Sequence, residues 1–133
     1  MTILIGYLPT AEGEAALTAG LEEARHRAED VIVLNSPRAG QAVDPALASP
    51  EQLEKLLKRA AEAGVQASVR QPAHTDDLTD AFITLSEEVD ASLIVIGLRK
   101  RSNVGKFIMG SQAQRILLQV DRPVLAVKAA ASW

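Results

Sequence analysis

The stretch LIVIGLRKRSNVGKFIMGSQAQRILLQV, residues 93–120, decides the fold of this chain. Four consecutive apolar residues, Leu93–Ile96, predict a strand that is buried on both faces. Apolar residues then recur at helical spacing from Ala113 to Val120. The segment therefore predicts a strand, a connecting loop rich in glycine and cations, and a helix, which is the repeating unit of a parallel α/β sheet.

The same alternation extends over the rest of the chain. Further buried strands are expected at Thr2–Tyr7, Val31–Leu34 and Val124–Val127, and a weaker edge strand is expected around Val65–Val69, where apolar and polar residues alternate. Three more helices are indicated by stripes of apolar residues at helical spacing. The first stripe is Leu17, Leu21, Ala24 and Ala28, the second is Leu53, Leu56, Leu57 and Ala60, and the third is Leu78, Ala81, Phe82, Leu85 and Val89. The sequence predicts one α/β domain, residues 1–133, with a parallel sheet covered by helices on both faces.

Two boundaries of the second helix are marked in the sequence. Ser49, Pro50 and Gln52 have the spacing of a capping box with proline in the first helical position. Gly64 has the place of a residue that ends a helix in the left-handed conformation. The longest stretch without periodicity, Asn35–Ala48, contains two prolines and a glycine, and we expect it to be a mobile surface loop.

Composition excludes several classes of function. The chain has 133 residues, 47% of them hydrophobic, which suits a folded domain rather than a disordered one. A formal net charge of −3 and an aromatic content of 3% argue against binding to nucleic acid or to a membrane surface. The chain has no cysteine, which excludes thiolate catalysis and fits a reducing compartment. No signal peptide or membrane span is indicated, so we expect a cytoplasmic protein.

The loop from Gly97 to Ser111 follows the carboxyl end of a predicted strand, where ligands of open α/β sheets bind. Gly97 allows close approach of the backbone or a positive φ, and Gly110 with Ser111 precede a helix whose free N–H groups favour an anion. The cations of the loop, Arg99, Lys100, Arg101 and Lys106, would add donors for phosphate oxygens. Ser111 can equally be a helix cap, because Gln114 completes a capping box, so both interpretations stay open. The loop is not a Walker A motif, since its lysine does not precede the final serine.

The last predicted strand, Val124–Val127, is apolar although it can form an edge of the sheet. Exposed apolar edges promote aggregation unless they are covered. The simplest cover is the same strand of a second copy in two-fold antiparallel pairing. We therefore expect a homodimer that is paired through Val124, Leu125, Ala126 and Val127.

Nearly the whole sequence resembles the universal stress protein family. The family signature G-x2-G-x9-G-[ST] is matched at Gly97, Gly110 and Ser111, while Lys100 stands at the second glycine, so the motif is degenerate. The opening ILIGY with GEAAL, the run EVDASLIVIGLRKRS and the ending QRILLQVDRPVLAV are also similar to the family. The resemblance implies a Rossmann-like fold of the adenine nucleotide alpha hydrolase type, with five parallel strands in the order 3-2-1-4-5. It also implies a dimer paired through the last strand.

The resemblance further implies a ligand and a site. Family members that bind nucleotide hold the phosphates with the signature loop and the next helix start, contact the nucleoside with an aspartate after the first strand, and read adenine at the end of the second strand. Leu8 replaces that aspartate here, and Lys100 replaces a flexible glycine. The expected ligand-binding residues are Tyr7, Leu8, Leu34, Gly97, Arg99, Lys100, Gly105, Lys106, Gly110, Ser111 and Gln112. The expected ligand is ATP, AMP or ADP, with Mg²⁺ as a companion of the phosphates.

Two functions follow from these residues. The first is a stress-response sensor or regulator that binds an adenine nucleotide and hydrolyses ATP very slowly at most, because no general base against a γ-phosphate is evident. The second is a dimeric interaction module whose basic loop meets an anion or an acidic partner, which Leu8 and Lys100 favour. The two histidines, His26 and His74, have no partners with metal-ligand spacing, and no nucleophilic triad is indicated.

Overall fold

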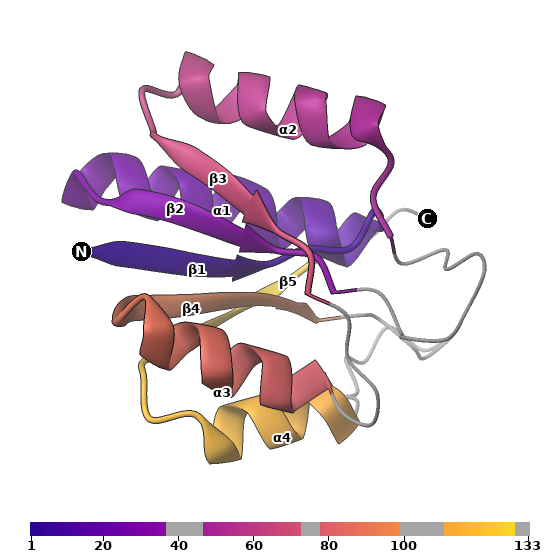
Figure 1. Ribbon diagram of the computed structural model, residues 1–133, viewed down its shortest axis with the longest axis vertical. Helices are drawn as coiled ribbons and strands as arrows, with labels where there is room; N and C mark the ends of the chain where they lie inside the picture. Colours follow the sequence, from indigo (N-terminus) through magenta and orange to yellow (C-terminus); the bar gives the residue numbers. More distant parts are fainter. Residues whose placement is uncertain (37–46, 73–77, 99–110, 130–133) are drawn as a thin grey trace.

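The computed structural model describes residues 1–36, 47–72, 78–98 and 111–129. Strands and helices alternate along the chain, and Figure 1 shows them in three layers. The elements are β1 (Thr2–Gly6), α1 (Ala11–Arg27), β2 (Asp30–Leu34), α2 (Pro50–Glu62), β3 (Ala67–Arg70), α3 (Leu78–Glu88), β4 (Ala91–Leu98), α4 (Ser111–Gln119) and β5 (Val124–Lys128).

All four strand pairings are parallel, and the strand order is β3-β2-β1-β4-β5. This order confirms the expected arrangement 3-2-1-4-5. Strand β1 lies in the middle, between β2 and β4, with Gly6 opposite Leu34 and Ile5 opposite Val95. The connection from β1 leads to one side of the sheet and the connection from β4 to the other, so a hollow is expected at their carboxyl ends.

The core has two halves, one on each side of the sheet. Helices α1 and α2 cover one face, and α3 and α4 cover the other (Figure 1). Alternate residues of β1 serve the two halves: Ile3 and Ile5 pack under α1 and α2, whereas Leu4 packs against α3 and α4. This alternation is why the central strand β1 must be apolar on both of its faces.

Helix α1 packs closely on the sheet because small residues face the strands. Gly13, Ala16, Gly20 and Ala24 are all buried along this side of the helix. A Cβ atom at Gly20 would overlap the side chain of Ile5 on β1. The close packing therefore depends on the absence of a side chain at Gly20.

The helix boundaries confirm some expectations and correct others. Ser49 and Gln52 form the predicted capping box at the start of α2, and Gly64 follows α2 with a φ of 75°. Ala28 does not continue the stripe of α1, because the helix ends at Arg27 and Ala28 is an exposed cap in the left-handed conformation. Leu57 was expected on the buried side of α2 but is 39% exposed, since Leu56 and Ala60 fill the contact with the sheet.

The stretch expected as a mobile surface loop is buried at its two described ends. Asn35, Ser36 and Ala48 are all shielded from solvent, so the expectation is wrong for these residues. Residues 37–46 between them lie outside the described residues. The physical reason is hydrogen bonding by Asn35, which is described with the site below.

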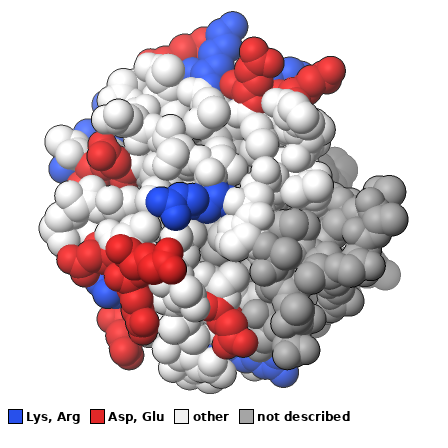
Figure 2. All heavy atoms as spheres, in the orientation of Figure 1, with Lys and Arg blue, Asp and Glu red and all other residues white. Residues whose placement is uncertain are grey.

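Strand β5 forms one edge of the sheet, and its residues Val124–Val127 are half-buried. On the face shown in Figure 2, cations and carboxylates are intermixed at the top of the view, over α2. In the described part of the chain, no helix is long and apolar enough to cross a bilayer.

Candidate functional site

A pocket opens at the carboxyl ends of β1, β2 and β4, beside the start of α1, α3 and α4. Its volume is about 110 Å³, far above the roughly 10–15 Å³ that a single water needs, so it has room for an organic group. The described residues that line it are Gly6, Tyr7, Leu8, Glu12, Gly13, Leu34, Ser36, Leu78, Phe82, Ile96, Gly97, Gln112, Ala113 and Ile116. The pocket is where the strand order reverses, as ligand sites of open α/β sheets are.

Five of the residues predicted from the sequence meet in this pocket, which are Tyr7, Leu8, Leu34, Gly97 and Gln112. Ser111 is the first residue of α4, next to Gln112 at the pocket wall. The other candidates, Arg99, Lys100, Gly105, Lys106 and Gly110, lie outside the described residues, as does Arg101. The predicted residues that the structure describes thus come from three strand ends and one helix start.

The floor of the pocket is apolar. Leu34, Phe82, Ile96 and Ile116 are buried there, and they come from β2, α3, β4 and α4. A Cβ atom at Gly6 would overlap the ring of Phe82, so the glycine lets this ring lie against the end of β1. A floor of this kind suits a flat apolar group such as a nucleobase. Apart from Leu34, which was also an expected ligand-binding residue, the sequence identified these residues only as core positions, because a residue below a pocket has the same pattern as any core residue.

The polar groups of the pocket stand around this floor. Glu12 is in the first turn of α1, Ser36 follows β2, and Gln112 is in the first turn of α4. Ser36 donates a hydrogen bond from its hydroxyl to the carbonyl of Pro72. Neither Glu12 nor Ser36 was among the predicted site residues. An acidic residue in the first turn of a helix is so common that Glu12 carries no signal in the sequence.

Gly97 has a packing role that is independent of any ligand. A Cβ atom at this position would overlap the carbonyl oxygen of Glu12 in α1. The expected close approach of the backbone is therefore made to α1. The alternative expectation, a positive φ at Gly97, is wrong, because among the described glycines only Gly64 has one.

Asn35 organises the edge of the sheet next to the pocket. Its side chain is fully buried, and its Nδ2 donates to the carbonyl of Tyr7 at 3.0 Å. Its Oδ1 accepts from the backbone N–H of Ala48 and from Nε2 of Gln71, both at 2.9 Å. One side chain thus ties the end of β1 to the end of β3 and to the segment that leads into α2. The sequence offers one signal for it, a polar residue placed directly after a buried strand.

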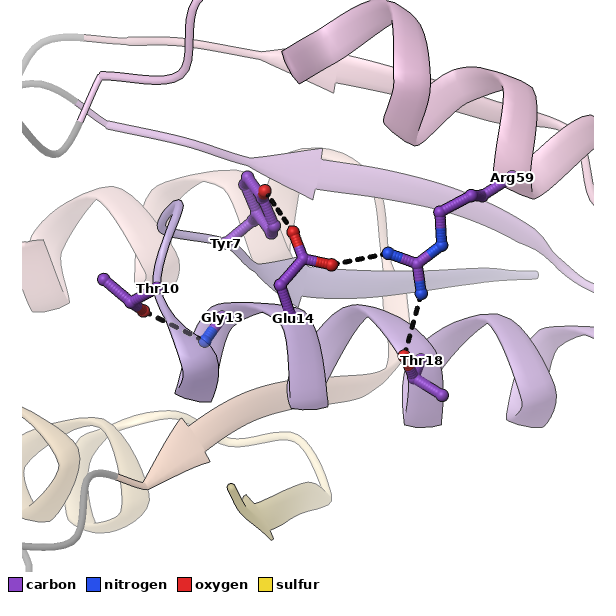
Figure 3. A network of polar contacts seen from close by, with 6 residues as sticks. All are labelled: Tyr7, Thr10, Gly13, Glu14, Thr18 and Arg59. Atoms are coloured by element: carbon purple, nitrogen blue, oxygen red, sulfur yellow. Dashed lines mark hydrogen bonds and ion pairs between the residues drawn. The ribbon is translucent and has the colours of Figure 1, made fainter. Parts of the chain in front are cut away.

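Tyr7 connects the pocket to the opposite face of the sheet. Its hydroxyl donates to Glu14 at 2.6 Å, Arg59 of α2 donates to the other oxygen of Glu14 at 2.5 Å, and Arg59 also donates to Thr18 at 2.8 Å (Figure 3). Burial raises the pKa of Tyr7, and the hydrogen bond to Glu14 raises it further. The network joins residues far apart in the sequence, so no local pattern could predict it.

A second hollow, of about 400 Å³, lies between α1 and α2 and is lined in part by this network. Its volume exceeds that of the first pocket, but Glu14 and Arg59 already satisfy one another there. The first pocket is therefore the better candidate, because it combines an apolar floor with polar groups at its rim.

Metal chemistry has little support in the described part of the chain. No group of three or more potential metal ligands occurs among those residues. His26 is exposed on α1 and contacts the guanidinium of Arg25 at 3.2 Å. His74 lies outside the described residues.

Comparison with known proteins gives one consistent result. The family model for the universal stress protein family matches residues 1–128. A universal stress protein of Mycolicibacterium smegmatis is 38% identical over 126 residues, which are 95% of this chain and 96% of that protein. A solved universal stress protein from Archaeoglobus fulgidus has a TM-score of 0.81 at 31% identity, covering 96% of this chain and 98% of the other. A structure of the universal stress protein from the same organism in complex with dAMP has a TM-score of 0.76 at 27% identity, with the same coverage.

Proposed function

This chain belongs to the universal stress protein family, and from that premise we propose that it binds an adenine nucleotide in the pocket at the carboxyl ends of β1, β2 and β4. The observation that carries the proposal is the pocket itself, with its apolar floor and polar rim at the reversal of strand order. A relative of 27% identity has been solved in complex with dAMP, which supports an adenine nucleotide as the ligand.

The proposed pose follows from the chemistry of the walls. The base lies on the apolar floor around Leu34 and Phe82, beside the backbone of Tyr7 and Leu8. The phosphates point toward the first turn of α4, where Ser111 and Gln112 stand and where free N–H groups favour anions. On the basis of the sequence alone, the proposed phosphate-binding residues also include the cations Arg99, Lys100 and Lys106 and the glycines Gly105 and Gly110.

ATP, ADP and AMP are all candidate ligands, and the phosphates would bring Mg²⁺ with them. The biological role that we propose is sensing or regulation in a stress response, with ATP hydrolysis that is very slow at most. Homodimer formation through Val124, Leu125, Ala126 and Val127 is part of the proposal, since these half-buried residues form an edge strand. A cytoplasmic location is proposed from the absence of cysteine in the sequence.

The deciding experiment is calorimetric titration of the purified protein with AMP, ATP and GTP, together with mass analysis of any nucleotide that copurifies. We expect binding of the adenine nucleotides and weaker affinity at high salt. Ser111→Ala should weaken ATP binding more than it lowers the melting temperature, and an unchanged affinity would make Ser111 a helix cap only. Leu8→Asp should tighten binding of the nucleoside, because a carboxylate there can accept from sugar hydroxyls.

The second candidate function is a dimeric interaction module without a nucleotide. One observation favours it: Gly97 is required by packing against Glu12, so this glycine is explained without a ligand. Absence of binding heat with any nucleotide up to millimolar concentration would select this function. Light scattering tests the dimer separately, and a monomer at micromolar concentration would contradict it.

A further inference from the structure

Glu12 stands out among the groups around the pocket. Of the described residues that line it, Glu12 alone carries a formal charge. The residue is half-buried in the first turn of α1, where the helix dipole stabilises a carboxylate. A carboxyl group therefore stands at a wall that a nucleotide would touch.

The position of Glu12 in the pocket can be fixed through its neighbours. Its carbonyl oxygen and its Cβ atom both lie against Gly97, at the end of β4, and Gly97 also lines the pocket. Leu8 lines the pocket on the side of β1. Glu12 thus stands next to the apolar floor, at the carboxyl end of β4.

A carboxylate discriminates sharply between the parts of a nucleotide. It repels phosphate, it gains nothing from the faces of a base, and it accepts hydrogen bonds from hydroxyl groups. The sugar lies next to the base in any nucleotide, and Glu12 lines the pocket next to the floor on which the base is placed. A carboxylate has about four lone-pair sites, so it can accept from a ligand in addition to the contacts it makes within the protein.

We propose that Glu12 is a specificity-determining residue that accepts hydrogen bonds from the sugar hydroxyls of the bound nucleotide. This inference rests on the proposed nucleotide site and deepens it. Its consequence is a preference for ribonucleotides over deoxyribonucleotides that originates in α1. The chemistry concerns binding alone and involves no covalent step.

The test is a set of titrations that combines variants of the protein with variants of the sugar. Wild type, Glu12→Gln and Glu12→Ala are each titrated with AMP, 2′-deoxy-AMP and 3′-deoxy-AMP. All three ligands carry the same phosphate, so any change in phosphate repulsion cancels in the ratio of their affinities. Glu22→Gln is the matched control, because Glu22 is an exposed residue of the same helix that does not line this pocket.

We expect wild type to bind AMP about tenfold to hundredfold more tightly than at least one deoxy ligand, as a charge-assisted hydrogen bond predicts. Both Glu12 variants should lose most of that preference, whereas Glu22→Gln should keep it. A Glu12 variant that keeps the wild-type ratio overturns the inference, and so does an equal loss of affinity for all three ligands. If wild type binds no adenine nucleotide, the proposed function fails as well, so the two failures are distinguishable.

Discussion

Replacing Asn35 by alanine tests whether one buried side chain holds the rim of the pocket together. The side chain is 0% exposed and makes hydrogen bonds to the carbonyl of Tyr7, the N–H of Ala48 and the amide of Gln71. In Asn35→Ala the groups of Tyr7 and Ala48 lose their partner in a place that water does not reach. Gln71 is exposed, so its amide can turn to solvent.

The size of the effect follows from these two orphaned groups. A buried polar group without a partner costs about 1–3 kcal/mol, so the free energy of unfolding should fall by about 2–6 kcal/mol. A domain of this kind has about 5–15 kcal/mol in total, so the loss is a large fraction of its stability. The melting temperature should fall by roughly 10–20 °C.

Urea unfolding followed by far-ultraviolet circular dichroism measures this change, and Gln71→Ala is the matched control. The control removes only the hydrogen bond between Gln71 and Asn35, at an exposed side chain, and should lower the free energy of unfolding by no more than about 1 kcal/mol. A loss below about 1 kcal/mol in Asn35→Ala, with an unchanged slope against urea, would refute the reasoning.

A second variant separates the role of the amide donor from that of the acceptor. Asn35→Asp keeps an acceptor for Ala48 but places a carboxylate against the carbonyl of Tyr7. Burial and this repulsion should raise the pKa of the new carboxyl group in the folded state above its unfolded value of roughly 3.9. The variant should therefore be close to wild type near that pH and lose stability as the pH rises. A stability difference from wild type that does not change with pH would contradict the assigned donor.

Two further predictions concern residues around the same strand ends. Gly97→Ala should lower the free energy of unfolding by about 1–3 kcal/mol, because the new Cβ would overlap the carbonyl oxygen of Glu12. A thermal unfolding curve identical to that of the wild type would show instead that α1 can move away. Tyr7 has a pKa above its ordinary value of 10.0 through burial and its bond to Glu14, so stability should fall as the pH rises beyond about 10, and less steeply in Tyr7→Phe. Tyr7 is the one tyrosine of the chain, so tyrosinate absorbance reports its titration directly, and an ordinary midpoint in the folded protein would rule out the raised pKa.

The fold was predictable because its signals are local. A run such as Leu93–Ile96 is too apolar to be exposed on either face, and Ser49 with Gln52 can form a capping box from spacing alone. The errors arose where packing decides between similar residues. Leu57 fits the apolar stripe as well as Leu56 does, yet Leu56 and Ala60 fill the contact with the sheet and Leu57 stays 39% exposed.

The candidate site was predictable in its position and less so in its chemistry. Gly97 was expected from the signature and Gln112 from the helix start that follows it, and both line the pocket. Asn35 was assigned to a mobile loop, because hydrogen bonds to partners 13 to 36 residues away leave no periodic pattern. Glu12 looked like any acidic residue at a helix start until the fold brought it beside Gly97.

The close packing of α1 on the sheet has a mechanical consequence for the pocket. Gly20 brings α1 into direct contact with Ile5, so we expect the helix and the central strand to move together. When a molecule binds beside Leu8, we expect α1 to stay in place on that side of the pocket. Any structural adjustment is then expected in the opposite wall, which is formed by residues of α3 and α4. For the proposed ligand, any displacement on binding is therefore expected in α3 and α4 rather than in α1.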